Sequence, residues 1–282
     1  MSHEKDNLVV AFQGMPGAYS NMACEAYFPN AKTLPCNSFE DMLNSTKNAL
    51  SDYSMVPVEN SLAGRVADIH HLIPDSGLFI VGEHFQKVNH QLLGLENSNL
   101  ENIESVKSHA QGLAQCRKFI SDHNLSPIQH IDTAGAAEEI SRLGDPKVAA
   151  IASDMASKIY NLKILKNDIE DAEHNTTRFL IMARKPNIPS AEIAKPVTTI
   201  IFEVRSVPAA LYKVLGGFAT NGINLTKLES YIGGKEMSAA RFYVDAEGHP
   251  DTKSMQNALE EMYFYSQPNS VKIIGTYSRR KN

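Results

Sequence analysis

The chain has 282 residues, of which 43% are hydrophobic and 21% are charged, which is ordinary for a globular protein. Its formal net charge of -5 argues against nucleic acid or an anionic membrane as the main partner, because such binding sites present a basic surface. No stretch approaches the roughly 20 apolar residues that cross a bilayer. At about 100–200 residues per domain, the length indicates two domains.

The N-terminal segment MSHEKDNLVVAF is charged and then enters a short apolar run, without the long apolar core and cleavage site of a signal peptide. The three cysteines, Cys24, Cys36 and Cys116, are an odd number at scattered spacings. They predict reduced thiols rather than a disulfide framework. We therefore expect a cytoplasmic protein.

Short β-branched runs alternate with helical patterns over the first two-thirds of the chain. Residues 8–12 predict a strand, and residues 19–28, after a glycine turn, predict a helix. Residues 38–50 begin with an N-cap serine and repeat apolar residues near helical spacing. Further strands are expected at 53–58, 78–81, 105–107, 127–131, 148–151 and 177–182, and helices at 111–122, 134–143 and 153–160. This alternation predicts βαβ units and a largely parallel sheet.

Residues 185–196 (KPNIPSAEIAKP) carry three prolines and predict a linker between a first domain, 7–184, and a second, 197–282. The elements expected in the second domain are strand 197–205, helix 208–221 with Pro208 in its first turn, strand 223–232, a turn at Gly233 and Gly234, strand 236–245, helix 252–265 and strand 270–277. This βαββαβ order is that of a ferredoxin-like domain.

Polar clusters fall at strand ends and turns of the first domain, where ligands bind in open α/β sheets. Each has an ordinary structural explanation as a βα turn, a helix cap or an alternating strand, with Thr133, Ser108, Asn60 or Ser61 as capping residues. Taken together they offer mostly neutral donors, which suits a small polar anion and does not establish catalysis. The clusters are GMPGAYS (14–20), PVENS (57–61), SHAQ (108–111), DTA (132–134) and NTTRF (175–179).

Other kinds of site lack their sequence signals. His70 and His71 are adjacent and diverge on a helix, and His84 and His90 have no matching acidic or thiol cluster. Neither a P-loop nor a GxGxxG follows the first strand, and no GxSxG occurs. We therefore expect no metal and no nucleotide cofactor, and a serine hydrolase is disfavoured.

The five clusters resemble the motifs of prephenate dehydratases, in the family's order. GMPGAYS resembles the GxxGxYS loop, PVENSLAG the PxENS segment, SHAQGLAQC the SHPQALAQC segment, DTAGAA the DTAxAA segment, and NTTRF the NxTRF segment that carries an essential threonine. The resemblance implies a two-lobed α/β domain like type II periplasmic binding proteins, with its site in the cleft. It also implies conversion of prephenate to phenylpyruvate, in L-phenylalanine biosynthesis, without a cofactor.

The same resemblance assigns residues. Thr177 takes the place of the essential threonine, and Asn60 and Gln111 match polar residues that support activity. Further substrate-binding positions are Ser20, Ser61, His109, Thr133, Arg178 and Phe179. Threonine is too weak an acid to be poised near neutral pH, so we expect it to stabilise the departing hydroxyl by a hydrogen bond in a dry cleft.

Arg178 is the expected carboxylate partner of the substrate, since its fork binds carboxylates bidentately, although strand neighbours alternate sides. Ala110 and Gly112 replace the usual proline and alanine of the SHPQAL segment. These changes are conservative in size, and we expect activity to survive them.

The second domain resembles an ACT regulatory domain, with PAALYKVL and NLTKLES where the family has PGALxxxL and NxTxIESRP. This implies feedback inhibition by L-phenylalanine bound between paired domains of a homodimer or homotetramer. The matching effector-binding residues are Ala210, Leu211, Asn224, Leu225, Glu229 and Ser230. Ala209 replaces a glycine and Tyr231-Ile232 replace an Arg-Pro, so this site departs further from the family than the catalytic one.

Two alternatives stay open. An arogenate dehydratase shares every motif quoted, and kinetics with both substrates distinguish it. A cytosolic small-anion-binding module without catalysis is compatible with the fold alone, but the intact Thr177, Asn60 and Gln111 argue against it.

Overall fold

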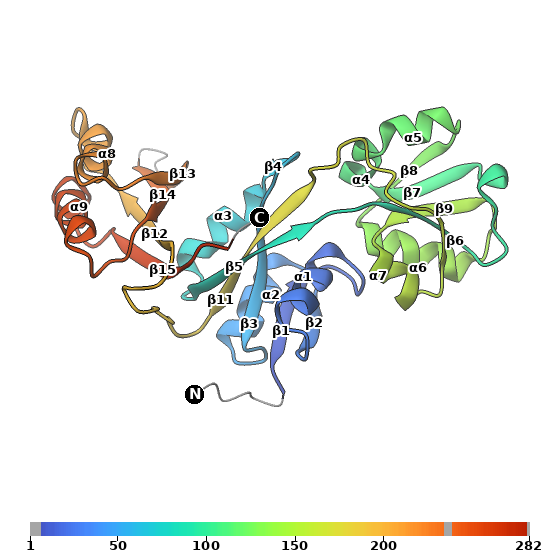
Figure 1. The fold of residues 1–282 in the computed structure, drawn as a ribbon, viewed down its shortest axis with the longest axis horizontal. Helices are drawn as coiled ribbons and strands as arrows, with labels where there is room; N and C mark the ends of the chain where they lie inside the picture. The colour runs from blue at the N-terminus through green and yellow to red at the C-terminus, as the bar shows by residue number, and fades with distance from the viewer. Residues whose placement is uncertain (1–6, 234–238, 281–282) are drawn as a thin grey trace. The chain divides into compact units, whose positions relative to one another are not determined.

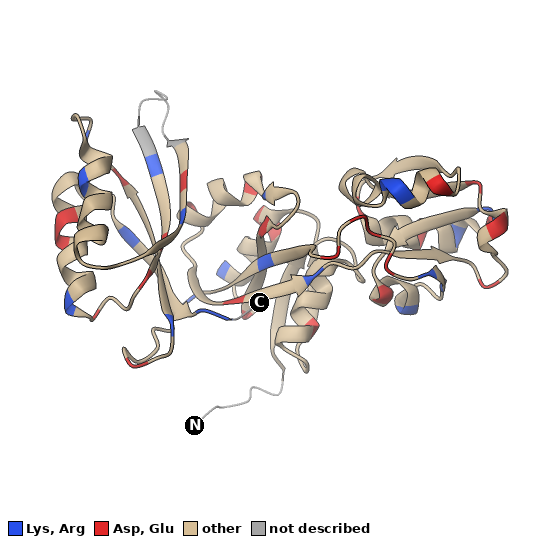
Figure 2. Ribbon diagram, turned by 45° about the horizontal axis from the view of Figure 1, so that its top comes forward, with Lys and Arg blue, Asp and Glu red and all other residues tan. Residues whose placement is uncertain are grey.

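The computed structural model describes residues 7–233 and 239–280, drawn as a ribbon in Figure 1. Contacts divide the chain into two compact units: unit 1 is Met1–Ile69 with His84–Phe179, and unit 2 is His70–Glu83 with Leu180–Asn282. Unit 2 therefore takes in a segment from within residues 7–184. Acidic and basic residues are interspersed along both units (Figure 2). In the described residues, no helix is both long and apolar enough to cross a membrane.

The N-terminal part of unit 1 is a parallel sheet. The central strand β1 (Val9–Gln13) pairs in parallel with β2 (Lys32–Cys36) and with β3 (Tyr53–Asn60). Strand β11 (Thr176–Ala183) also lies next to β3 in the sheet order. The short strand β4 (Gly64–Arg65) pairs antiparallel with the end of β3. The helices here are α1 (Tyr19–Tyr27) and α2 (Phe39–Lys47). The expected N-cap of α2 is confirmed, because the Ser38 hydroxyl accepts from Asp41 N at 3.0 Å.

Unit 1 also contains a second sheet of five strands in the order β10-β6-β9-β7-β8. Its strands are β6 (Gln91–Gly94), β7 (Ser105–His109), β8 (Ser126–His130), β9 (Val148–Ala152) and β10 (Lys163–Lys166). Strand β7 is parallel to β8 and β9, but β6 and β10 are antiparallel. The expected parallel pairing thus holds for part of each sheet. The helices are α4 (Ala110–Gln115), α5 (Arg117–Asp122), α6 (Thr133–Leu143) and α7 (Asp154–Ile159), so the helix expected at 111–122 is broken at Cys116.

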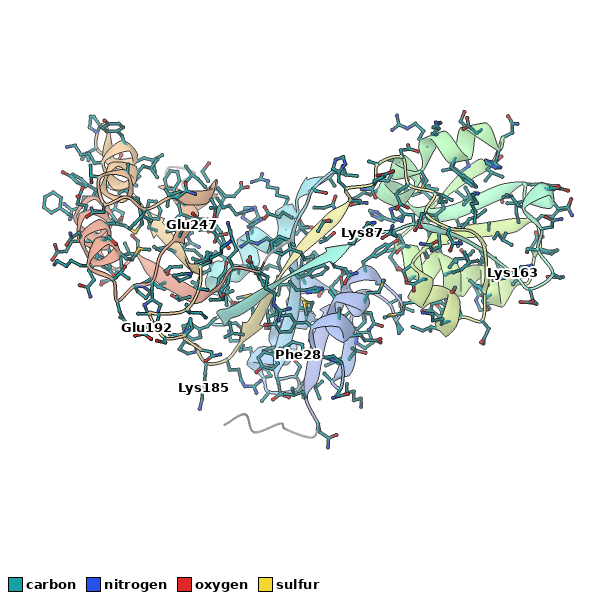
Figure 3. All side chains as sticks on the ribbon, viewed as in Figure 1. Phe28, Lys87, Lys163, Lys185, Glu192 and Glu247 are labelled. Atoms are coloured by element: carbon teal, nitrogen blue, oxygen red, sulfur yellow. The ribbon has the colours of Figure 1, made fainter. Side chains whose placement is uncertain are left out.

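Unit 2 has the expected βαββαβ order. Its elements are β12 (Pro196–Glu203), α8 (Ala210–Thr220), β13 (Leu225–Gly233), β14 (Ala239–Glu247), α9 (Lys253–Tyr265) and β15 (Lys272–Ser278). The antiparallel sheet has the order β13-β14-β12-β15. Strand β14 of the second βαβ half lies between β13 and β12 of the first, and β12 lies between β14 and β15 of the second. The core of unit 2 brings Phe202 and Val244 of the sheet together with Phe218 of α8 and Met262 of α9. Figure 3 draws the side chains of the described residues on the ribbon.

Two details of the predicted second domain change. Helix α8 begins at Ala210, so Pro208 precedes the helix instead of occupying its first turn. Gly233 is the last residue of β13, while Gly234 and the first residues of the strand expected at 236–245 lie outside the described residues.

The segment His70–Glu83 joins unit 2 through specific contacts. It comprises the end of α3 (Ala67–Leu72), a 3-10 turn η1 (Ile73–Asp75) and the start of β5 (Phe79–Lys87). The His70 ring packs edge-on against Tyr243, Asp75 lies 3.4 Å from Arg241, and Ile80 pairs with Gly275 in β15. These interactions are between residues far apart in sequence, which is why the strand-helix pattern alone did not reveal them.

Candidate active site

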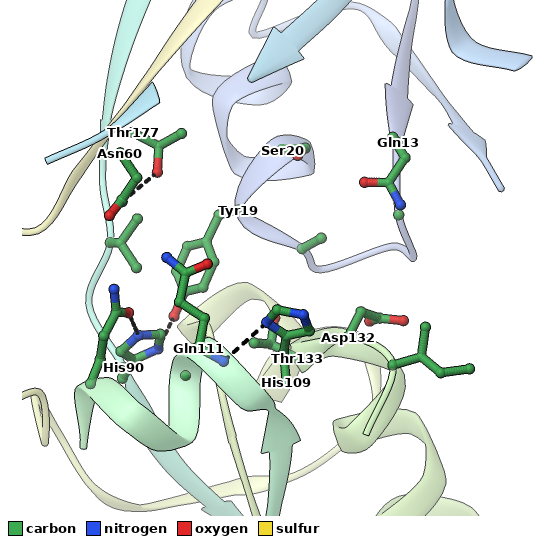
Figure 4. Close-up of a pocket in the computed structure, with 16 residues that line it drawn as sticks. Gln13, Tyr19, Ser20, Asn60, His90, His109, Gln111, Asp132, Thr133 and Thr177 are labelled. Carbon is green, nitrogen blue, oxygen red and sulfur yellow. Dashed lines mark hydrogen bonds between the residues drawn. The ribbon is translucent and has the colours of Figure 1, made fainter. Parts of the chain in front are cut away.

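A cavity of about 300 Å³ lies in unit 1, bounded by the ends of strands and the starts of helices (Figure 4). The end of β1 contributes Gln13 to its lining, and the start of α1 contributes Tyr19 and Ser20. Asn60 ends β3, and Thr177 lies near the start of β11. The remaining polar lining comes from the region of the second sheet: His90, His109, Gln111, Gln115, Asp132 and Thr133. The cavity is therefore assembled from segments far apart in the chain.

Six of the residues expected at the site line this cavity: Ser20, Asn60, His109, Gln111, Thr133 and Thr177. Three do not. The Ser61 hydroxyl donates to His174 O at 2.7 Å, and Phe179 is buried in the core. Arg178 is 5% exposed and lies 3.0 Å from Glu59. Because successive side chains of a strand point to opposite faces, Thr177 reaches the cavity and Arg178 does not.

The Asn60 amide is held in one orientation. Its Oδ1 accepts from the backbone N–H groups of Leu62 and Ala63 at 3.0 and 2.9 Å. Its Nδ2 therefore donates, to Asn175 Oδ1 at 2.7 Å and to Thr177 Oγ1 at 3.0 Å. Since the Thr177 oxygen accepts this bond, its own hydroxyl hydrogen is available to a molecule in the cavity.

Gln115 and Asn175 are site residues that the sequence analysis missed. The Asn175 side chain is fully buried and donates from Nδ2 to Gln115 Oε1 at 3.0 Å. His90 Nε2 lies 2.7 Å from the same oxygen. These contacts occupy the Gln115 amide oxygen and leave its amide nitrogen as a donor, and Gln115 lines the cavity. The available signal was spacing, because Gln115 follows Gln111 by four residues and shares its helix face.

Two side chains contact the nitrogens of the His90 ring. The Gln115 oxygen can only accept, so Nε2 carries the hydrogen, and Nδ1 lies 2.8 Å from the Tyr19 hydroxyl. Burial lowers the pKa of His90 below its ordinary value of 6.5, against the opposing effects of Gln115 and Glu170. Burial likewise raises the pKa of Tyr19 well above 10.0.

This state of His90 predicts a loss of stability in acid. Below about pH 6.5, His90 is protonated in the unfolded chain but stays unprotonated in the folded chain, because its pKa is lower there. The free energy of unfolding therefore falls as the pH falls. Urea unfolding between about pH 7 and pH 5 measures this dependence. The His90→Gln variant should be less stable near neutral pH but should lose less stability on acidification. Equal slopes in the two proteins would contradict a buried neutral His90.

The helix caps beside the cavity differ from those expected. His109 caps α4, with Nδ1 accepting from Gln111 N at 3.2 Å, and the Ser108 hydroxyl instead donates to Ile151 O at 2.7 Å. Asp132 caps α6, with Oδ1 accepting from Gly135 N at 2.6 Å. The cap at Asp132 leaves the Thr133 side chain free to line the cavity.

An α/β fold with two sheets and a cavity of mostly neutral hydrogen-bonding groups defines a site for a small polar molecule. The profile of the family described as prephenate dehydratase matches residues 10–187. The chain belongs to the prephenate dehydratase family, and it is an enzyme of the lyase class.

Named relatives extend over nearly the whole chain. A protein of Komagataeibacter europaeus named bifunctional N-acyl-homoserine lactone acylase/prephenate dehydratase is 44% identical over 273 residues, 95% of each chain. Arogenate dehydratase/prephenate dehydratase 2 of Arabidopsis thaliana is 37% identical over 95% of this chain and 72% of that protein. The solved structure of prephenate dehydratase from Arthrobacter aurescens in complex with L-Phe has a TM-score of 0.88 and 26% identity, covering 96% of this chain and 90% of that one.

Proposed function

We propose that this chain converts prephenate to phenylpyruvate, carbon dioxide and water, as a step in phenylalanine biosynthesis in the cytoplasm. The observation that carries the proposal is the pair formed by Asn60 and Thr177 in the cavity, 3.0 Å from Nδ2 to Oγ1. It leaves a hydroxyl donor in a fixed place, and the described residues that line the cavity include no lysine or arginine. We assign the catalytic domain to residues 7–184.

The reaction needs positioned donors and no redox partner. As the ring carboxylate leaves as carbon dioxide, the electron pair of its carbon–carbon bond enters the ring. The carbon–oxygen bond at the opposite ring carbon breaks, and the leaving hydroxide keeps that bonding pair and takes up a proton to become water. Aromatisation supplies the driving force. The barrier lies in the charge that develops on the departing oxygen.

We assign the stabilisation of that charge to Thr177 and Gln115. Thr177 keeps its hydroxyl hydrogen because Oγ1 already accepts from Asn60, and Gln115 offers its amide nitrogen because Oε1 accepts from Asn175. Donors held in place before the reaction stabilise developing charge without reorganising. His90 and Tyr19 hold this arrangement as neutral groups, while Ser20 and Gln111 provide further contacts on the lining.

Incubation of the purified protein with prephenate tests the proposal directly. Phenylpyruvate should accumulate, measured by its absorbance in alkali, together with one equivalent of carbon dioxide. The Thr177→Ala variant serves as the matched protein control. A protein that is folded and yet forms no phenylpyruvate would overturn the proposal.

Arogenate dehydration is the second candidate. The plant relative named arogenate dehydratase/prephenate dehydratase 2 is 37% identical over 277 residues, so both substrates fit proteins of this similarity. Arogenate undergoes the same bond changes and gives phenylalanine. Measuring kcat/KM for both substrates ranks the two activities.

The cavity gives less support to amide hydrolysis, the other activity in the name of the Komagataeibacter europaeus protein. Such hydrolysis uses a nucleophile activated by a base. Among the described hydroxyls that line the cavity, Tyr19 is the one that hydrogen-bonds a histidine, and burial raises its pKa. Behind His90 lies the amide of Gln115 instead of a carboxylate. We therefore propose the lyase reaction.

We further propose that residues 185–196 link the catalytic domain to an ACT domain, 197–282, that binds phenylalanine between subunits of a homodimer or homotetramer. The βαββαβ order supports this assignment. Ala209 has a φ of 61°, a conformation that favours glycine, and glycine is the residue that the resemblance places there. The proposed effector residues lie on α8 (Ala210, Leu211), just before β13 (Asn224) and on β13 (Leu225, Glu229, Ser230).

Two of these residues already have partners. Asn224 donates to Glu247 Oε2 at 3.0 Å, and Glu229 lies 3.7 Å from Lys227. An effector ammonium must therefore compete with Lys227 for Glu229. This competition and the strained Ala209 indicate weaker binding than a free carboxylate would give.

Phenylalanine is expected to inhibit the enzyme, with a coupling of about 1–3 kcal/mol between effector and substrate. Calorimetry and initial rates measure binding and inhibition, with D-phenylalanine as the matched control ligand. If L-phenylalanine binds but does not inhibit the enzyme, the domain has an effector-binding site but no regulatory role. The absence of both at millimolar L-phenylalanine would contradict the sensor assignment.

A further inference from the structure

The cavity has two ends with different chemistry. Thr177 and Asn60 lie together at one end, and His109, Thr133 and Asp132 lie across from them in Figure 4. Strands β7 and β8 are parallel neighbours, and their last residues, His109 and His130, are paired in the register. Asp132 lies two residues after the end of β8. Both side chains therefore emerge at the carboxyl ends of adjacent strands.

The shape of prephenate determines which of its groups lies at each end of the cavity. The leaving hydroxyl is on the ring carbon opposite the one that carries the carboxylate and the three-carbon side chain. With the hydroxyl at Thr177, the side chain extends toward His109 and Asp132. Prephenate and arogenate differ only there, since one has a ketone oxygen where the other has an ammonium group.

His109 presents a donor to this end. Its Nδ1 accepts the helix-capping bond from Gln111 N at 3.2 Å, so the hydrogen of the neutral ring is on Nε2. No described residue partners Nε2, and His109 lines the cavity. An N–H group can bond to a ketone oxygen and cannot bond to an ammonium group, which has only donors.

Asp132 presents an acceptor with a negative charge. Its Oδ1 accepts from Gly135 N at 2.6 Å, while Oδ2 takes no hydrogen bond from any described residue. The side chain lines the same cavity and is half-buried. A carboxylate attracts the ammonium of arogenate and repels the doubly negative prephenate.

We propose that His109 and Asp132 determine the choice between the keto acid and the amino acid at this site. His109 favours prephenate through its Nε2–H, and Asp132 favours arogenate through Oδ2. The two groups act in opposition, so the ratio of the two activities reflects their balance. The inference rests on the proposed dehydratase function.

The test compares kcat/KM for prephenate and arogenate in the wild type and in two variants that keep the helix caps. Asn is a good N-cap residue, and its Oδ1 replaces the capping atom in both Asp132→Asn and His109→Asn. Asp132→Asn should lower arogenate turnover by roughly tenfold or more and leave prephenate turnover equal or higher. His109→Asn should lower prephenate turnover by several-fold to roughly tenfold and lower arogenate turnover by a smaller factor, so that the substrate ratio shifts toward arogenate.

The control is Glu138→Gln. Glu138 is an exposed carboxylate on α6 that does not line the cavity, so its removal changes the local charge without removing a contact. If Glu138→Gln shifts the substrate ratio as much as Asp132→Asn does, the effect of Asp132 is one of local charge, and its direct contact with the substrate is overturned. Equal losses of both substrates in both cap-preserving variants would show a structural role and would also overturn the proposal.

The outcomes separate this inference from the proposed function. A wild-type protein that converts neither substrate overturns both. A wild-type protein that makes phenylpyruvate, with variants of unchanged substrate ratio, overturns the specificity assignment alone. Circular dichroism checks folding, and if one variant fails to fold, the opposite shift expected of the other decides the question.

Discussion

The Thr177→Ala variant is expected to lose about 10²–10³ in kcat while its fold stays intact. The hydroxyl oxygen accepts from Asn60 Nδ2 at 3.0 Å and keeps its own hydrogen for the substrate, and alanine removes this group without adding volume. Asn60 Nδ2 keeps its bond to Asn175 Oδ1, so the surrounding hydrogen bonds persist. The loss should therefore appear in catalysis rather than in stability.

Two further variants separate the hydroxyl from the shape of the side chain. Thr177→Val keeps the volume and removes the hydroxyl, so it should be as inactive as alanine. Thr177→Ser keeps the hydroxyl and should retain much of the activity. Steady-state kinetics with prephenate, together with thermal unfolding of each protein, make the comparison. A valine variant with near wild-type kcat would show that the hydroxyl does not stabilise the leaving group.

The sequence predicted elements well where a local pattern determines them. The apolar runs of β1, β3, β9 and β11 and the serine cap of α2 were all expected near their observed positions. The βαββαβ order of unit 2 was also expected. These elements could be predicted because the spacing of apolar residues and the capping residue are both set by a short stretch of sequence.

Pairing between distant segments was harder to predict. The antiparallel β6 and β10 and the association of His70–Glu83 with unit 2 depend on contacts that no single segment encodes. Strand β2 also escaped prediction, because its sequence KTLPC has little alternation and contains a proline.

The candidate site shows the same limit. Thr177 and Asn60 were identified by motif, and the structure adds the bond between them. Arg178 is directed to Glu59 because its strand position points away from the cavity. Gln115 was overlooked because its role depends on Asn175, 60 residues further along the chain.

Replacement of Gly17 is expected to lower both stability and activity. Its φ is +87°, and a Cβ there would lie 2.8 Å from Ala156 Cα at the start of α7. The same loop is bonded to that region, because Ser153 donates to Gly17 O and the Tyr160 hydroxyl donates to Pro16 O at 2.9 Å. A side chain at Gly17 must therefore displace a backbone that is already held on both sides.

The Gly17→Ala variant should lose about 2–5 kcal/mol of unfolding free energy, combining the cost of a left-handed alanine with that of overpacking. Activity should fall as well, because Tyr19 and Ser20 follow in the same loop and helix and line the cavity. A displacement of about 1 Å in such groups can cost roughly a hundredfold in rate.

Gly144→Ala is the matched control. Gly144 has a similar φ of +71° at the end of α6, but a Cβ there would meet nothing within 4 Å. It should cost only about 1 kcal/mol and leave kcat/KM unchanged. Urea unfolding and prephenate kinetics on both variants isolate the contact with Ala156 from the backbone conformation. If Gly17→Ala proves no worse than Gly144→Ala in either measurement, the close approach of this loop to α7 is not needed to shape the site.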